Sequence, residues 1–448
     1  MSISLANISL WQSTFVSLPI NLMVQNIVTQ NPLQDVFIDR ATYQTTEHIF
    51  SHQVDPRSKI TNQKSSGRCW LFAALNTMRI EMMKKHDLKE FEFSQSYLFF
   101  YDKLERSNYV LEAIIDAKKN NYKVDSQMIQ HLLSDPLGDG GQWDMVANLI
   151  NKYGIVPKSV YPESRHSSYS REMNSILTRK IREYAKDLME TNENVQNLKN
   201  KMIGEMYQML CKFLGTPPSV FNWEYSNKNG YKIIKDLTPI NFYQNIVPFN
   251  VDEYYSLIND PRNEYNKLYS IQYLGNVVEG YKVRYLNVAI DRMKELSKNM
   301  ILDNEPVWFG CDVGKENLKS SCLMDKNILA YEEPLGVKFN LTKKEKLIYK
   351  ESLMTHAMVL SGCNIIEDNN SVCNKVSQKV NRWEVENSWG DRGPAKGYCM
   401  ITDKWFDEYV YEVLINKKYL NKEELYVIEQ EEFQVLPPWD PLGALAKN

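Results

Sequence analysis

The sequence lacks several features that would place it in a common class. No apolar run reaches the roughly 18 residues that a membrane-spanning helix needs. The 53 Lys and Arg residues almost balance the 56 Asp and Glu residues. The resulting net charge of −3 does not indicate nucleic acid as a partner, although a local basic patch could still bind it. Because no apolar run is long enough to span a membrane, we expect no membrane partner.

The first 39 residues contain neither Lys nor Arg. Ser, Asn and Gln interrupt the apolar residues of this segment throughout. A secretory signal needs a basic start followed by an unbroken apolar stretch, and neither is found here. We expect an ordered N-terminal arm that lies on the body of a cytoplasmic protein.

Cysteine is scarce, and its spacing excludes two common roles. The seven cysteines are an odd number spread over 448 residues, and no Cys-x-x-Cys pair occurs. This pattern argues against a structural zinc site. Cys363 and Cys373 are close enough in sequence to pair, but without a secretory signal we expect reduced thiols. We predict neither a bound metal nor a cofactor.

The first strong pattern is a helix that begins at Cys69. Leu71, Leu75, Met78 and Met82 recur at spacings of 4, 3 and 4, which predicts one buried helix face. Further helices are expected from about residue 94, after residue 141 and over 167–214. Short runs rich in Val, Ile and aromatic residues predict strands at 306–313, 355–363, 382–387 and 397–401. The expected fold class is α+β, with an α-rich half before a β-rich half.

Cys69 is a candidate nucleophile because of its place in the predicted helix. The reactive form of cysteine is the thiolate, and the unpaired N–H groups and dipole of a helix N-terminus favour negative charge. Gly67, two residues earlier, allows a backbone geometry in which the sulfur faces a cleft. A lone cysteine is more often a buried structural residue, so further residues must support this interpretation.

Three residues elsewhere supply groups that a cysteine nucleophile needs for acyl transfer. Gln63 offers an amide donor for an oxyanion, beside the N–H of Cys69. His356 stands at the head of an apolar strand and is the candidate base, although an isolated His there is more often a packed core residue. Asn387 follows 31 residues later and can orient the imidazole. Trp389 is placed to shield that hydrogen bond from water.

Gly140 and Gly141 are the candidate substrate-contacting backbone. Positions without a side chain allow the backbone of a bound peptide to approach closely. The alternative is a tight turn before the helix predicted after residue 141, and both can hold. Trp389 joins these two glycines among the expected substrate-binding residues.

The order Gln, Cys, His, Asn resembles that of the papain-like cysteine peptidases. His356 lies 287 residues after Cys69, whereas papain and the cathepsins place it roughly 130–150 residues downstream. Extra chain is therefore expected before His356. The motifs at 62–76, 139–144, 355–358, 385–390, 396–398 and 438–446 are similar to those of the bleomycin hydrolase and aminopeptidase C family.

The resemblance implies a papain-like two-domain fold, a helical half plus a β-barrel-like half, with a large helical insertion and a C-terminal arm. It also implies a homohexamer whose active sites face an internal channel, and an arm that lies in the active-site cleft. The expected divisions are an N-terminal arm (1–58), a helical half (59–164), an oligomerisation insertion (165–275), a β-rich half (276–430) and a C-terminal arm (431–448).

The C-terminal arm has chemistry that suits this role. Three prolines at 437, 438 and 441 favour an extended chain, and the small residues 443–446 can lie along a cleft. A terminal carboxylate near Ala446, an expected substrate-binding residue, would pair with the free α-amine of a peptide. Because Lys447 and Asn448 follow Ala446, we expect the enzyme to trim its own tail after Ala446 or Lys447. The alternative is a frayed end, against which Leu436, Trp439 and Leu442 argue.

The predicted function is that of a cysteine aminopeptidase acting on peptides with a free N-terminus, by thiolate acyl transfer. By resemblance it also hydrolyses bleomycin-like amides. The alternative function is a nucleic-acid-binding hexameric ring with secondary peptidase activity.

Overall fold

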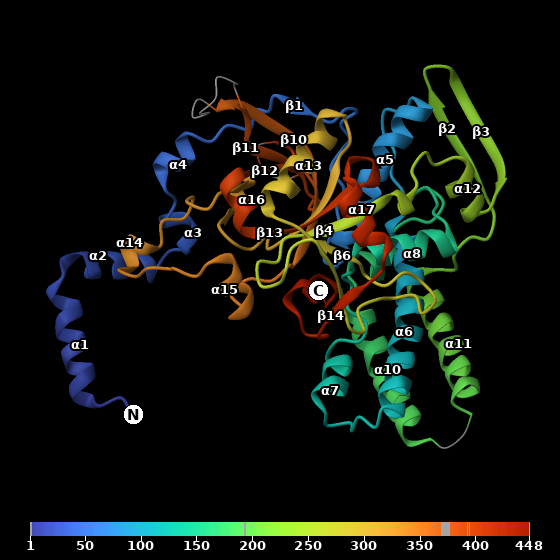
Figure 1. Cartoon of the computed structure of the whole chain (residues 1–448), viewed down its shortest axis with the longest axis horizontal. Coiled ribbons are helices and arrows are strands. Elements are labelled where there is room, and N and C mark those ends of the chain that lie inside the picture. Colours follow the sequence, from blue (N-terminus) through green and yellow to red (C-terminus); the bar gives the residue numbers. More distant parts are fainter. Residues whose placement is uncertain (1, 192–193, 369–376, 392, 394, 448) are drawn as a thin grey trace.

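The computed structural model describes residues 2–191, 194–368, 377–391, 393 and 395–447 (Figure 1). The helices are α1 (Leu5–Ser17), α2 (Pro19–Val28), α3 (Leu33–Val36), α4 (Arg40–Gln44), α5 (Cys69–His86), α6 (Gln95–Lys119), α7 (Gln127–Ser134), α8 (Trp143–Tyr153), α9 (Arg165–Ser168), α10 (Arg171–Glu190), α11 (Val195–Leu214), α12 (Pro239–Asn245), α13 (Ile290–Leu302), α14 (Glu332–Leu335), α15 (Lys343–Ile348), α16 (Asp403–Tyr409) and α17 (Lys422–Glu429). None of the helices in the described ranges has the length and apolar character needed to cross a bilayer.

The strands gather mainly in the second half of the chain. They are β1 (His52–Gln53), β2 (Phe221–Asn227), β3 (Gly230–Leu237), β4 (Tyr254–Ile258), β5 (Lys267–Ile271), β6 (Tyr285–Asn287), β7 (Val307–Cys311), β8 (Asn317–Leu318), β9 (Leu323–Met324), β10 (His356–Asp368), β11 (Ser377–Glu386), β12 (Tyr398–Thr402), β13 (Val410–Asn416) and β14 (Phe433–Leu436). The α+β class predicted from the sequence is confirmed.

One mixed sheet forms the β-rich half of the molecule. Its order is β14-β5-β6-β4-β13-β7-β10-β11-β12-β9-β8, and β1 pairs with β10 beside this path. Helix α5 packs against β10. The register of β10 places His356 opposite Cys311 of β7. The start of α5 and the start of β10 are therefore held on one packed unit.

Helix α5 is more deeply buried than its sequence pattern indicates. The predicted face of Leu71, Leu75, Met78 and Met82 is buried, but so are ten other residues of the 18-residue helix. These include Asn76 and Arg79, which are polar. Arg79 forms a buried ion pair with Glu386 at the end of β11. A helix enclosed on most sides is a central element, which fixes the position of its N-terminus.

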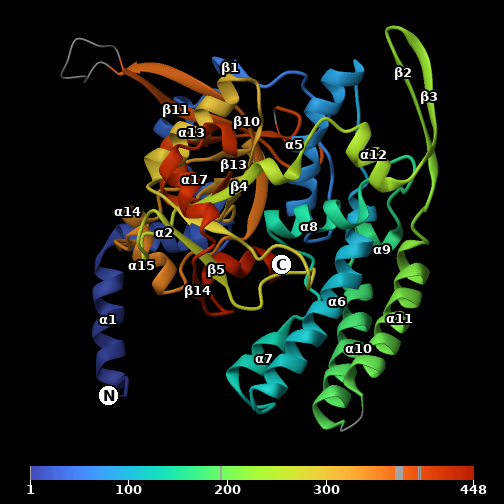
Figure 2. The ribbon, with the colours of Figure 1, turned by 45° about the vertical axis from the view of Figure 1, so that its right-hand side comes forward.

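A group of helices projects from one side of the sheet (Figures 1 and 2). Helix α6 packs against α10 and α11, and α7 packs against α6. Residues at intervals of about four on α10 form its buried face, including Met173, Leu177 and Ile181. The segment 165–275 thus contains long helices, as expected, and the hairpin β2–β3, whose first strand the alternating aromatic residues of 221–225 predict. It also contains strands β4 and β5 of the main sheet, which were not expected.

The N-terminal arm lies on the body only in part. Ile38 forms a backbone bridge with Leu329, and α2 packs against α14. Helix α1 projects away from the body in both views, so the expectation that the whole arm lies on it is wrong (Figures 1 and 2). Every residue of α1 and α2 is described, and none is buried. Apolar residues occur around α1 rather than on one face, which gives it no single surface to pack.

The C-terminal arm is packed against the body. Strand β14 pairs in parallel with β5, and Leu442, Leu445 and Ala446 are buried. The expected extended conformation holds only for β14, because Pro441–Lys447 form a 3₁₀ helix. Asp440 starts this turn, since its side chain accepts from the N–H of Leu442 and its carbonyl from that of Gly443. The chain end is not frayed over the residues described.

Candidate active site

Cys69 is the first residue of α5, and only 2% of it is exposed. Its sulfur accepts hydrogen bonds from the backbone N–H groups of Trp70 and Ala357. Ala357 follows His356 directly at the start of β10. The contact therefore brings the sulfur, the N-terminus of a helix and the strand that carries His356 to one point.

His356 and Asn387 form the hydrogen bond expected from their sequence positions. His356 Nε2 lies 3.0 Å from Asn387 Oδ1, and the same oxygen accepts from the N–H of Ser388 at 2.7 Å. Because Oδ1 can only accept, Nε2 carries the proton and Nδ1 remains an acceptor. The Trp389 ring lies 4.9 Å from the imidazole, centroid to centroid, and covers this pair.

Gln63 is hydrogen-bonded to Ser388, the residue that follows Asn387. Its backbone N–H donates to the Ser388 carbonyl at 2.9 Å, and its Oε1 accepts from the Ser388 hydroxyl at 2.6 Å. Its Nε2 donates to the Ser66 carbonyl at 2.7 Å. An amide nitrogen has two N–H groups, so the second remains available to another acceptor.

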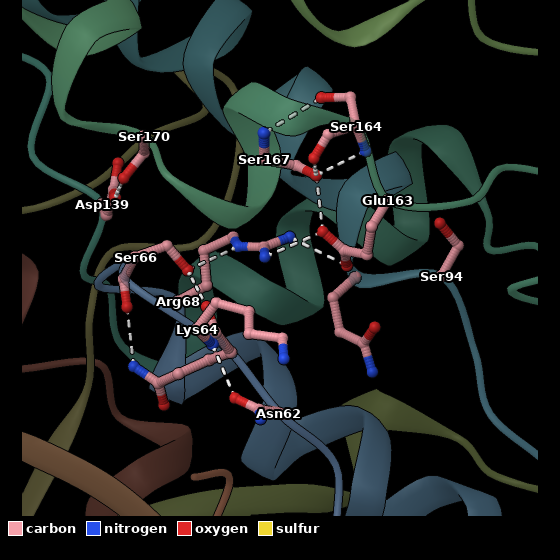
Figure 3. A network of polar contacts seen from close by, with 12 residues as sticks. Asn62, Lys64, Ser66, Arg68, Ser94, Asp139, Glu163, Ser164, Ser167 and Ser170 are labelled. Atoms are coloured by element: carbon pink, nitrogen blue, oxygen red, sulfur yellow. Dashed lines mark hydrogen bonds and ion pairs between the residues drawn. The ribbon is translucent and has the colours of Figure 1, made fainter. Parts of the chain in front are cut away.

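A buried arginine braces the loop between Gln63 and Cys69 (Figure 3). Arg68 Nε donates to Ser66 Oγ at 2.9 Å, and Ser66 Oγ donates to the Gln63 carbonyl at 2.7 Å. Arg68 Nη1 also donates to Glu163 Oε1 at 3.1 Å. Burial acts to raise the pKa of Glu163, but the charge and hydrogen bond of Arg68, together with Ser167 and Lys158, lower the net pKa. The loop is thus tied to a fixed ion pair.

Asp139 connects the same loop to the glycine segment 138–141. Its carboxylate accepts from the Gly67 N–H at 3.1 Å, and its carbonyl accepts from Trp70 Nε1 at 2.7 Å. Lys103 lies 2.7 Å from its other oxygen. Burial acts to raise the pKa of Asp139, but Lys103 and hydroxyl and amide donors lower it to about 2. Asp139 is therefore a charged brace at neutral pH.

The two glycines have different neighbours. A Cβ built on Gly140 would lie 1.7 Å from the Leu445 carbonyl oxygen, so the C-terminal arm passes directly over this position. A Cβ on Gly141 would lie 2.6 Å from the Trp70 ring. Ala446 is buried, and its carbonyl accepts from Arg106 at 3.1 Å. The structure brings Gly140 and Ala446 together and gives Gly141 a packing reason to lack a side chain.

The geometry agrees with the comparisons with known proteins. The sequence profile described as the Peptidase C1-like family matches residues 2–443. The chain belongs to this family. It is 44% identical to human bleomycin hydrolase over 439 residues, which is 95% of each chain. It is 41% identical to aminopeptidase C of Listeria monocytogenes over 434 residues, covering 96% of this chain and 95% of the relative.

A solved structure shows the same fold. The crystal structure of PepW from Lactobacillus rhamnosis has a TM-score of 0.94 and 40% sequence identity, covering 99% of both chains. The resemblance inferred from the sequence motifs is confirmed, and the protein is a papain-like cysteine peptidase.

Burial sets the protonation of the candidate pair in this peptidase. It raises the pKa of the Cys69 thiol to about 11, against the hydrogen bonds from Ala357 and Trp70. It lowers the pKa of His356 to about 4, against the hydrogen bond with Asn387. Both effects favour a neutral thiol and a neutral imidazole in this structure. A proton must then move from sulfur to nitrogen during the reaction.

This burial predicts a loss of stability in mild acid. As pH falls below 6.5, the unfolded chain binds a proton at His356 before the folded peptidase does. The free energy of unfolding should therefore fall by about 3 kcal/mol between pH 6.5 and pH 4 from this group alone. Urea denaturation across this range checks it, with His356→Gln as the comparison. Parallel loss of stability in both proteins would contradict the assignment.

Several residues of the site carried no clear signal in the sequence. Arg68 and Glu163 stand far apart in sequence, as do Arg106 and Ala446, so no local pattern links them. One signal was present for Arg106, because Asp102 precedes it by four residues, the spacing of an ion pair on one helix face. Cys373 lies outside the described residues, and no disulfide joins the cysteines that the structure describes.

Proposed function

We propose that this peptidase is a cysteine aminopeptidase in which Cys69 is the nucleophile, His356 the base and Asn387 the residue that orients it. One observation carries the proposal. The end of the chain itself packs on Gly140, in the loop that Asp139 ties to the start of α5. An end that fills one side of the site limits how many residues of a peptide can lie on the N-terminal side of the scissile bond.

The reaction follows from the placement of the donors. His356 Nδ1 takes the thiol proton as the Cys69 sulfur attacks the first carbonyl of the substrate. The Cys69 N–H and the second N–H of Gln63 stabilise the oxyanion, and each such donor contributes about 10²–10³ in rate. The imidazolium then protonates the leaving amine. His356 activates water, which hydrolyses the thioester and restores the thiol.

The preference for a free amine comes from the arm. A carboxylate at the end of the arm would form an ion pair with the α-amine of a substrate and fix its register. Ala446, Gly140, Gly141 and Trp389 are the proposed substrate-binding residues around this point. Similarity to proteins named aminopeptidase C and bleomycin hydrolase supports hydrolysis of N-terminal residues and of bleomycin-like amides.

Paired fluorogenic substrates test this function. We expect an aminoacyl amide with a free α-amine to be hydrolysed at least tenfold more efficiently, in kcat/KM, than its N-acetylated twin. Equal hydrolysis of both substrates, or activity that survives Cys69→Ala, would contradict the proposal.

We further propose that six copies assemble, the state that the family resemblance implies. The apolar side chains of α1 support an assembly, because Leu5, Trp11 and Phe15 are 84%, 55% and 41% exposed. Light scattering should give about six times the 52.4 kDa of one chain. Removal of residues 2–28 should lower that mass. A full-length chain that is monomeric at micromolar concentration would exclude the assembly.

We place the protein in the cytoplasm because its chemistry suits a reducing compartment. No disulfide joins the described cysteines, and the reactive thiol must stay reduced to act. The alternative function, a nucleic-acid-binding ring, receives no support from the matched family or from the names of the relatives.

A further inference from the structure

Polar anchors fix the C-terminal arm along its length, in addition to a hydrogen bond at its tip from Lys447 Nζ to the His131 carbonyl at 3.3 Å. At its base, Arg262 Nη2 donates to Asp440 Oδ1 at 2.9 Å. In the middle, Gln142 Nε2 donates to the Leu442 carbonyl at 3.3 Å. Near the end, Arg106 Nη1 donates to the Ala446 carbonyl at 3.1 Å. The Arg106 anchor is nearest to the position where a substrate's N-terminus would stop.

Arg106 connects the arm to the glycine loop. Its Nη2 donates to the Gly140 carbonyl at 2.6 Å, while Nη1 holds Ala446. One guanidinium thus bridges two carbonyls from segments more than 300 residues apart. A planar, forked donor suits this task, whereas an ammonium group is a point charge on a flexible stem.

Asp102 holds Arg106 in place and balances its charge. The carboxylate accepts from Arg106 Nε at 3.2 Å and from Nη2 at 3.1 Å. Asn276 Nδ2 donates to the same carboxylate at 3.0 Å, and also to the Met145 carbonyl at 3.1 Å. All three side chains are buried. The pair adds no net positive charge, so it would not repel a cationic α-amine beside the arm.

We propose that Arg106, braced by Asp102, is the positioning residue that fixes the end of the arm and thereby sets the exopeptidase register. This inference rests on the proposed aminopeptidase function. Arg106 acts through the arm, so it changes where a substrate's N-terminus is held rather than the chemistry at Cys69. Its loss should raise KM for free-amine substrates and relax their preference over acetylated ones, with little change in kcat.

The test compares the ratio of kcat/KM for free-amine and N-acetylated aminoacyl amides in several variants. Arg106→Gln should lower this ratio about 10- to 100-fold, because a displacement of about 1 Å has an effect of that size. Arg382→Gln is the control. Arg382 lies on β11 and also donates to a carbonyl, that of Ile49 at 2.9 Å, which belongs to the N-terminal arm rather than the C-terminal one. It should leave the ratio unchanged.

A second background separates an action through the arm from a structural defect. In protein that lacks residues 443–448, Arg106→Gln should change the ratio no further, because its partner is gone. Arg106→Gln leaves Asp102 buried without its ion pair, so a double variant with Asp102→Asn removes both charges together. It should show the same lowered ratio if the single variant does not fold.

The outcomes separate the two proposals. A full-length protein with no preference for the free amine contradicts the aminopeptidase function and this inference with it. A full-length protein with the preference, and an Arg106→Gln or double variant that keeps it, overturns this inference alone. A further fall in the ratio on adding Arg106→Gln to the shortened protein also overturns it, since the effect would not pass through the arm.

Discussion

Replacement of Cys69 by alanine should reduce the hydrolysis of aminoacyl amides by about 10⁴-fold or more. The Cys69 sulfur accepts from the N–H of Ala357 at the start of β10, beside His356, so its removal takes the nucleophile from the site. The free energy of unfolding should change by only about 1 kcal/mol, because one sulfur atom is removed from a well-packed helix. Steady-state kinetics and thermal unfolding measure both effects.

The control for this variant is a second buried thiol. Cys363 lies on β10, the strand that begins with His356, and is fully buried. Cys363→Ala should therefore keep its activity. Comparable losses in the two variants would mean that Cys69 supports the fold rather than the reaction.

Replacement of His356 by glutamine should lower kcat/KM by about 10³-fold, the usual contribution of a general base. Only Nδ1 of His356 can accept the thiol proton, because Nε2 donates to Asn387. Asn387→Ala should have a smaller effect, because the imidazole keeps its proton acceptor and loses only its orientation. Rates measured across pH 4 to 8 would also show the acid limb in the parent protein and its absence in the His356 variant.

His52→Gln is the matched control for the base. His52 lies on β1, which pairs with β10 opposite Cys363, and its side chain is exposed. It should retain the parent rate. A His356 variant within tenfold of the parent would contradict the assignment of the base.

The elements that carry local signals could be predicted from the sequence. Ser94 caps α6, Gly154 ends α8, and β7, β10, β11 and β12 lie where short β-branched and aromatic runs were found. The order of Gln63, Cys69, His356 and Asn387 indicated one site. Each helix or strand signal lies within a few residues of the element that it predicts. The four site residues are distant in sequence, and their complementary roles in acyl transfer link them.

Other features depend on contacts that no local pattern encodes. The braces of Arg68 on Glu163 and of Arg106 on Ala446 join segments distant in sequence. Strands β4 and β5 lie in the main sheet, where β4 pairs with β13 and β6 and β5 pairs with β6 and β14, although their segment was expected to be helical. Helix α1 shows the converse, since the N-terminal arm was expected to lie on the body but no residue of α1 is buried in this single chain.

The buried charges around Cys69 explain how the site stays rigid. Arg68 with Glu163, Lys103 with Asp139 and Arg79 with Glu386 are ion pairs beside the first turns of α5 or the end of β11. Removal of one partner from such a pair leaves an unpaired buried charge, which costs about 3–5 kcal/mol. These pairs are expected to fix geometry rather than to add stability.

The central claim is that the chain's own end makes a papain-like site into an aminopeptidase. The most direct measurement is the ratio of kcat/KM for a free-amine aminoacyl amide and its N-acetylated twin, before and after removal of residues 443–448. This deletion leaves β14 and the Arg262–Asp440 ion pair in place. The account predicts a strong preference for the free amine in the full chain and a ratio near one in the shortened chain. An unchanged preference in the shortened chain would contradict it.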